Sequence, residues 1–73
     1  MKSSYLLPVY DGDGSFISHV FASSREDAEL KFMDDLVEEY GLKVMPTWDD
    51  FVEECGNNYI VVGDLYCAEE FEI

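Results

Sequence analysis

Basic residues are scarce in this chain of 73 residues, which has 4 Lys+Arg against 17 Asp+Glu and a formal net charge of −13. Proteins that bind DNA, RNA or an anionic membrane surface do so through clusters of lysine and arginine. The charge therefore excludes direct binding to nucleic acid or to such a membrane. It permits a partner protein with a basic surface.

The chain also has no long apolar run, and it has few cysteines. No stretch approaches the roughly 20 apolar residues of a membrane helix. The first apolar run is interrupted by Pro8 and is too short for a signal-peptide core. Small secreted domains usually carry four or more cysteines, whereas this chain has Cys55 and Cys67 alone. We therefore expect a cytoplasmic protein with reduced thiols, although the spacing does not decide whether the two pair.

Residues suited to catalysis or metal binding are equally few. His19 is the only histidine, and a serine or cysteine nucleophile needs such a base. Zinc needs three or four ligands at short spacing, which one histidine and two distant cysteines do not supply. Asp11–Gly14 is similar to the start of a calcium loop, but Val9 and Val20 stand where its first and last acidic ligands belong. We expect no enzyme, no cofactor and no metal site.

The hydrophobic content of 48% is too high for a disordered acidic tail, and we expect one small domain over residues 1–73. Two β-rich segments, Tyr5–Tyr10 and Phe16–Phe21, flank the turn-forming Asp11–Gly14 and predict an antiparallel hairpin. Pro8 has no N–H to donate to a neighbouring strand. We therefore expect the first strand at an edge of the sheet.

Two helices are predicted in the middle of the chain. The first covers about residues 24–40, with Ser23 and Glu26 in a capping-box pattern. Apolar residues recur there at three- and four-residue spacing, and Gly41 follows as the terminating glycine. The second, shorter helix begins after Thr47 as its N-cap.

The last part of the chain predicts further strands. Gly56–Asn58 ends the second helix, Tyr59–Val62 is the most strand-like run, and Leu65–Cys67 continues it or returns as a final strand. The order is therefore β-β-α-α-β, with one more strand possible. It favours an α+β fold, in which a small antiparallel sheet of three to four strands carries two helices on one face.

One acidic hexamer occurs twice. Asp34-Asp35-Leu36-Val37-Glu38-Glu39 recurs as Asp49-Asp50-Phe51-Val52-Glu53-Glu54. On a helix each Asp is four positions before a Glu, and like charges at that spacing destabilise the helix by a few tenths of a kcal/mol per pair. The first hexamer also lies in the last two turns of its helix, where the dipole favours cations. A sequence shaped for stability alone would place Lys or Arg there.

Two interpretations of these carboxylates remain open. Charge runs are usually solvated faces, but this net charge exceeds the magnitude of about 2–8 that keeps a small domain soluble. More acids follow at Glu69, Glu70 and Glu72. The other interpretation is phosphate mimicry, in which rows of carboxylates imitate a nucleic acid and occupy the basic groove of a protein that binds one.

In its size, its charge and its two Asp-Asp-x-Val-Glu-Glu segments, the chain resembles small phage-encoded inhibitors of host defence. These are the DNA-mimic anti-restriction proteins and several anti-CRISPR proteins. The resemblance implies a protein of the host-cell cytoplasm that binds a defence nuclease or a CRISPR effector. It would block the nucleic-acid site by occupancy, without catalysis.

The candidate partner-binding residues are the carboxylates of both hexamers and the tryptophan before the second one: Asp34, Asp35, Glu38, Glu39, Asp49, Asp50, Glu53, Glu54 and Trp48. Core packing is the alternative role for Trp48. Because high like charge opposes self-association at low salt, we expect a monomer. A second function also stays open: a small adaptor or assembly module that uses an apolar surface or a strand edge, such as Tyr59–Tyr66 or the terminal segment, with the acids kept for solubility.

Overall fold

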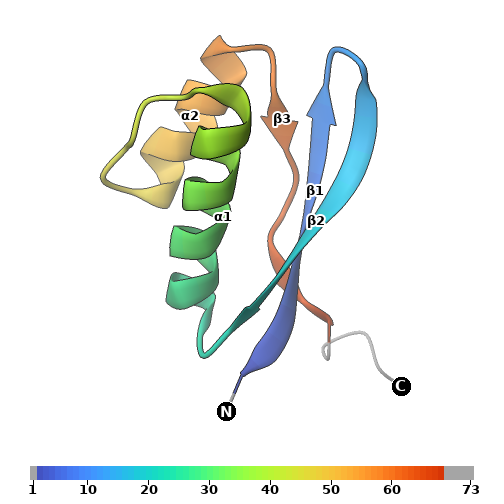
Figure 1. The fold of residues 1–73 in the computed structure, drawn as a ribbon, viewed down its shortest axis with the longest axis vertical. Coiled ribbons are helices and arrows are strands. Elements are labelled where there is room, and N and C mark those ends of the chain that lie inside the picture. The colour runs from blue at the N-terminus through green and yellow to red at the C-terminus, as the bar shows by residue number, and fades with distance from the viewer. Residues whose placement is uncertain (1, 69–73) are drawn as a thin grey trace.

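A computed structural model describes residues 2–68, and Figure 1 shows how the elements are arranged. Their order is β1 (Ser3–Asp11), β2 (Gly14–Ala22), α1 (Arg25–Tyr40), α2 (Trp48–Asn57), β3 (Val61–Val62) and β4 (Tyr66–Cys67). The strands form one antiparallel sheet, and both helices lie on the same face of it (Figure 1). The predicted α+β fold is confirmed, including the optional last strand.

The central strand of the sheet is β1, so the prediction that Pro8 marks an edge is wrong. β2 pairs with β1 along its whole length, and β3 and β4 pair with its other side. The carbonyl of Pro8 accepts a hydrogen bond of 2.8 Å from the N–H of Gly63, which lies between β3 and β4. The N and O atoms of one strand residue point to the same side, so the N–H that proline lacks would also point there. The sheet accommodates Pro8 in its centre because the neighbouring strand is interrupted at that position.

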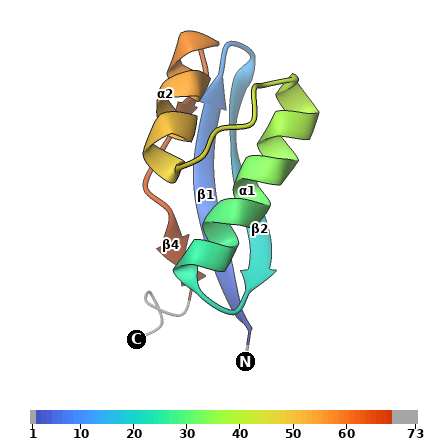
Figure 2. The same cartoon turned by 90° about the vertical axis from the view of Figure 1, so that its left-hand side faces the viewer.

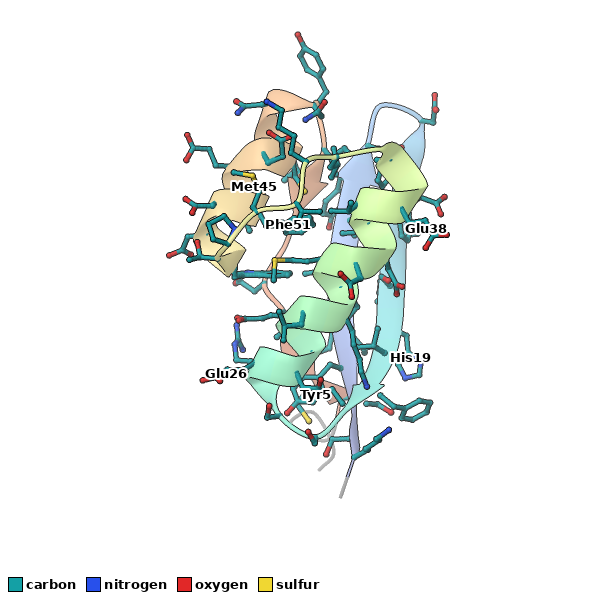
Figure 3. All side chains as sticks on the ribbon, turned by 60° about the vertical axis from the view of Figure 1, so that its left-hand side comes forward. Tyr5, His19, Glu26, Glu38, Met45 and Phe51 are labelled. Atoms are coloured by element: carbon teal, nitrogen blue, oxygen red, sulfur yellow. The ribbon has the colours of Figure 1, made fainter. Side chains whose placement is uncertain are left out.

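The hydrophobic core lies between the sheet and the helices. Its largest side chains are Phe32 of α1 and Phe51 of α2, which are fully buried, and Phe51 points into the space between the helices and the sheet (Figure 3). The smaller core residues are Leu7, Val9, Val20, Ala22, Ala28, Leu36, Leu42, Cys55, Ile60 and Leu65. No polar or charged residue of the described chain is buried. The described carboxylates are therefore all at least partly exposed.

The start of α1 differs from the prediction by one residue. Ser24, not Ser23, is the N-cap, and its hydroxyl accepts a hydrogen bond of 3.1 Å from the N–H of Asp27. The carboxylate of Asp27 in turn accepts the N–H of Ser23 at 3.1 Å. Asp27 thus fills the reciprocal role that the capping-box pattern assigned to Glu26. Because the helix begins one residue later than predicted, the carboxylate of Asp27, and not that of Glu26, accepts the N–H of Ser23.

The predicted ends of the helices agree better with the structure. Gly41 has φ 67°, in the left-handed region that glycine adopts without strain, and its N–H donates to the carbonyl of Val37. Thr47 is the N-cap of α2, since its hydroxyl accepts the N–H of Asp50 at 3.1 Å. Neither α1 nor α2 has the length and apolar character that crossing a membrane requires.

The third strand is shorter than the predicted Tyr59–Val62. Tyr59 has φ 63°, and the N–H of Ile60 donates to the carbonyl of Cys55 at 2.9 Å. These two residues therefore complete the turn that closes α2, and only Val61 and Val62 pair with β1. The acids Glu69, Glu70 and Glu72 lie outside the described residues.

Candidate functional site

Both helices run in the same direction, because residues 41–47 return the chain from the end of α1 to the start of α2 (Figure 2). The two helix C-termini therefore lie at the same end of the molecule as the β1–β2 turn (Figures 1 and 2). Parallel dipoles add, and each C-terminus contributes about half a negative charge. Neither helix has a basic residue in its last turn. We call the region formed by these C-termini and the turn at residues 11–14 the acidic end.

A hollow of about 600 Å³ opens between α1 and β2. Its walls are Phe16 and Ser18 from β2 and, from α1, Leu36 and three carboxylates: Asp35, Glu38 and Glu39. The three acidic residues are exposed, and Figure 3 shows Glu38 on the side of α1 that faces away from α2. Phe16 is 42% exposed. An aromatic ring therefore stands beside three carboxylates in what we call the acidic hollow.

The second hexamer does not reach the acidic hollow. α1 covers β2 and α2 covers β3, so α2 lies on the far side of α1 from the hollow (Figure 2). Asp49 and Glu53 of α2 are exposed, whereas Asp50 and Glu54 are half-buried. From the sequence, the carboxylates of both hexamers were predicted together as partner-binding residues. The structure places the two hexamers on different surfaces.

Glu54 has a structural role that the sequence did not indicate. Its Oε2 atom accepts the backbone N–H of Lys43 at 3.3 Å and the side-chain amide of Asn58 at 3.4 Å. The Asn58 amide also donates to the carbonyl of Glu54 at 2.8 Å. Glu54 therefore ties the segment between the helices to the end of α2. It is less available to a partner than the carboxylates of the hollow.

The carboxylates of the first hexamer have no partner within residues 2–68. The side chains of Asp34, Asp35, Glu38 and Glu39 make no hydrogen bond or ion pair with another residue of that range. The ion pairs of the described chain, Arg25–Glu29 at 3.8 Å and Lys31–Asp27 at 3.5 Å, lie in the first half of α1. These cations are therefore held away from the acidic end.

The acidic end contains one pair that sequence reasoning missed. The hydroxyl of Tyr40 donates a hydrogen bond of 2.6 Å to Oδ2 of Asp11, and Oδ1 accepts the N–H of Asp13 at 2.8 Å. These bonds, that of Tyr40 first, hold the pKa of Asp11 below its ordinary value. The same contact raises the pKa of Tyr40 to about 12. No sequence spacing signals this pair, because the two residues are 29 positions apart.

Trp48 lies at the first position of α2, at the opposite end of that helix from the acidic end. It is half-buried and packs against the core, with its ring centroid 5.4 Å from that of Phe51. Core packing therefore accounts for this tryptophan. It does not line the hollow with the carboxylates of α1.

The thiols and possible metal ligands offer little further chemistry. Cys55 and Cys67 are not joined to each other by a disulfide. Burial, and secondarily the charge of Glu54, raises the pKa of Cys55 to about 11, so its thiol is protonated at neutral pH. In residues 2–68, no three His, Cys, Asp or Glu side chains are grouped so that they could hold a metal ion.

Comparison with known proteins gives no match: no protein-family model, no curated protein and no solved structure is similar to this chain. The surface offers exposed carboxylates, an aromatic wall and a negative helix end, an arrangement suited to binding cationic side chains.

Proposed function

We propose that this protein is a non-enzymatic acidic inhibitor that binds the basic nucleic-acid-binding groove of a partner protein. It would act as a nucleic-acid mimic of the anti-CRISPR or anti-restriction type. The observation that supports this function most is the acidic hollow. Asp35, Glu38 and Glu39 stand there at the negative end of α1, with no ion pair to another residue of 2–68.

The density of charge on α1 is of the same order as that of a nucleic acid. Helix residues rise by about 1.5 Å each, so the six residues from Asp34 to Glu39, with their four carboxylates, occupy roughly 9 Å of helix axis. This is about one charge per 2.3 Å, against about one per 1.7 Å along duplex DNA. A groove built to neutralise phosphates would meet a comparable row of charges on a rigid helix.

The chemistry of binding follows from these groups. Lysine or arginine side chains of the partner would donate charge-assisted hydrogen bonds to the carboxylates, and arginine does so with both arms of its fork. A guanidinium entering the hollow would also lie near the exposed ring of Phe16. Since exposed charges are screened by salt, the complex should weaken as ionic strength rises.

The proposal also specifies the kind of partner and its compartment. A defence nuclease or a CRISPR effector in the host-cell cytoplasm has the required basic groove, and neither a cofactor nor catalysis is needed to block it. The carboxylates Asp49 and Glu53 of α2 would extend the contact to a partner that reaches around both helices.

Affinity capture tests this function. The tagged protein is incubated with bacterial lysate, eluted by a salt gradient, and the eluted proteins are identified by mass spectrometry. The proposal expects a nucleic-acid-binding complex that elutes at moderate salt and is displaced by added DNA or RNA. A captured protein that has no basic groove and resists salt would favour the adaptor function instead.

The adaptor function is retained as a second candidate because of one observation. The helix-free face of the sheet exposes Tyr10, Ile17, Phe21 and Val61. Binding through such a face would survive high salt, whereas binding through the carboxylates would not.

A further inference from the structure

The face of the sheet that points away from the helices is apolar, and no helix of the described residues covers it. Along β1 and β2 alternate residues are buried under the helices, and the intervening ones point outward. Among the outward residues, Tyr10 is 52%, Ile17 58% and Phe21 59% exposed, and Val61, opposite Tyr10 in β3, is 61% exposed. Both helices lie on the other side (Figure 1). We call this surface the outer face.

The outer face carries no carboxylate at any outward position of β1 or β2, although the chain has 17 Asp+Glu. These positions are Ser4, Leu6, Pro8, Tyr10, Ser15, Ile17, His19 and Phe21. His19 packs edge-on against Phe21, with ring centroids 4.7 Å apart. In so acidic a protein, an uncharged face of this extent is a feature that solubility does not explain.

The size of the face can be compared with that of known interfaces. An aromatic side chain can bury about 150–250 Å², so Tyr10 and Phe21 together present roughly 200 Å² of accessible surface. Ile17 and Val61, each more than half exposed, and the half-buried side chains between them bring the face to roughly 300–600 Å². This is the size of the largest apolar patch on a typical monomer, and such patches are often functional. A stable complex buries about 800 Å² per partner. The apolar face alone is smaller than this, so a dimer would also have to bury the polar rim around the face, and we expect it to be reversible.

We propose that the outer face is the interface of a homodimer, in which the sheets of two copies pack against each other. A two-fold interface sets the same patch against itself, so it must not repel itself. The outer face meets this condition in β1 and β2, whose outward positions carry no carboxylate, whereas the helix side of each copy would place Asp and Glu against Asp and Glu. Sheets pack face to face in this manner at about 10 Å.

The dimer leaves the carboxylates of the acidic hollow free, because they belong to α1, on the other side of the sheet. Phe16 borders both surfaces, since it also lines a smaller hollow with Pro8, Tyr10 and Ile17 of the outer face. The dimer would present two acidic surfaces on opposite outer sides. The homodimer does not depend on the proposed function. Salt should also affect it in the opposite direction from the complex with a basic partner. Two copies of charge −13 repel each other, and salt screens this repulsion without weakening apolar burial. The dimer should therefore strengthen as salt rises, which replaces the expectation of a monomer.

Sedimentation equilibrium over a range of protein concentrations, at low and high salt, tests the proposal. The key variant is Ile17→Thr/Phe21→Thr, because threonine is β-branched and is favourable in strands at both positions. The control is Leu30→Gln/Val44→Thr, which removes comparable side chains, 59% and 83% exposed, from α1 and from the segment that follows it. We expect a reversible dimer that strengthens with salt. The key variant should weaken it by roughly tenfold or more, since both copies lose both side chains, and the control should leave it unchanged.

A second variant keeps the test valid if the key variant folds poorly. Ser15 is exposed on the outer face, and Ser15→Glu adds a carboxylate there without removing apolar surface. It should lower dimerisation strongly at low salt and less at high salt. A protein that is monomeric at every concentration and salt would overturn the proposal. So would a dimer that neither variant weakens, since such a dimer would use another surface, such as the free edge of β2.

Discussion

Tyr40, the last residue of α1, donates a hydrogen bond of 2.6 Å to Asp11, the last residue of β1. The contact anchors the β1–β2 turn to the end of the helix that carries the acidic hollow. It also adds an ionised carboxylate to a region that already holds two negative helix ends. The contact therefore holds the Asp11 carboxylate at the acidic end, beside the C-terminus of α1.

Tyr40→Phe should lower stability in a pH-dependent manner. The pKa of Asp11 is lowered from its ordinary value of 3.8, so the contribution is present above that value and is lost as the pH falls through the folded pKa. The pKa of Tyr40 is raised from 10.0 to about 12, so the contribution is complete below pH 10 and is lost as the pH rises through about 12. Urea unfolding of both proteins across pH should show a difference at neutral pH that shrinks at both extremes. A difference that is the same at every pH would contradict this assignment.

Gly63→Ala should destabilise the sheet where β1 carries its proline. A Cβ at Gly63 would lie 3.1 Å from Cβ and 3.2 Å from Cγ of Pro8, which is tighter than ordinary contact. Overpacking of this kind costs about 1–3 kcal/mol. The matched control is Gly56→Ala in α2, where no atom lies within 4 Å of the added Cβ; it should raise stability by roughly 0.5–1 kcal/mol. Chemical denaturation measures the free energy of unfolding of both variants. The same change in both would contradict the close approach of Gly63 to Pro8.

Local signals in the sequence predicted most of the fold. β-rich composition and turn residues placed the hairpin, and Gly41 and Thr47 marked the helix boundaries, because caps depend on neighbours along the chain. Pro8 was placed wrongly because its position depends on a break in a strand some 55 residues away, at Gly63. Tyr59 was assigned to a strand by propensity, which the closing turn of α2 overrides.

The candidate site was predicted only in part. Helical spacing identified exposed carboxylates, and those of the first hexamer are indeed without partners in the described residues. What the sequence could not provide is which acids share a surface. The hollow depends on Phe16 of β2 lying beside α1, and the separation of the hexamers depends on α2 packing over β3. Both are consequences of tertiary packing, which spacing within one helix does not encode.

Neutralising acids at the two ends of α1 should have opposite effects on stability. Glu38→Gln and Glu39→Gln remove charge from the last turns, where the dipole opposes it, and each should raise stability by about 0.3–1 kcal/mol at low salt. Glu26→Gln removes a charge from the first turn, where the dipole favours it, and should lower stability by a similar amount. Thermal unfolding at low and high salt measures both effects. If Glu38→Gln and Glu39→Gln instead lowered stability, these acids would stabilise the fold, and no role in binding would be needed to explain them.

Tyr59→Gly should stabilise the protein. Tyr59 holds φ 63° and is 88% exposed, so its side chain contributes little packing to offset the left-handed backbone. That conformation costs about 1–2 kcal/mol for a non-glycine residue, and glycine should recover roughly 1 kcal/mol of it. Tyr59→Val is the control and should be less stable than the wild type, since a β-branched residue is strained further there. A lower free energy of unfolding for Tyr59→Gly would contradict this, because it would mean that the Tyr59 side chain stabilises the fold despite its exposure.

The most direct test of the account measures displacement of a labelled nucleic acid from the captured complex by three forms of the protein. The first is the wild type and the second is Asp35→Asn/Glu38→Gln/Glu39→Gln, which neutralises the acidic hollow. The third is Glu26→Gln/Glu29→Gln/Asp64→Asn, which removes the same charge outside it. We predict that the wild type and the third form compete about equally, and that the second loses roughly tenfold or more, as paired charges do at an interface. Equal loss in both variants, or no competition by the wild type, would contradict the central claim that the acidic hollow imitates nucleic acid.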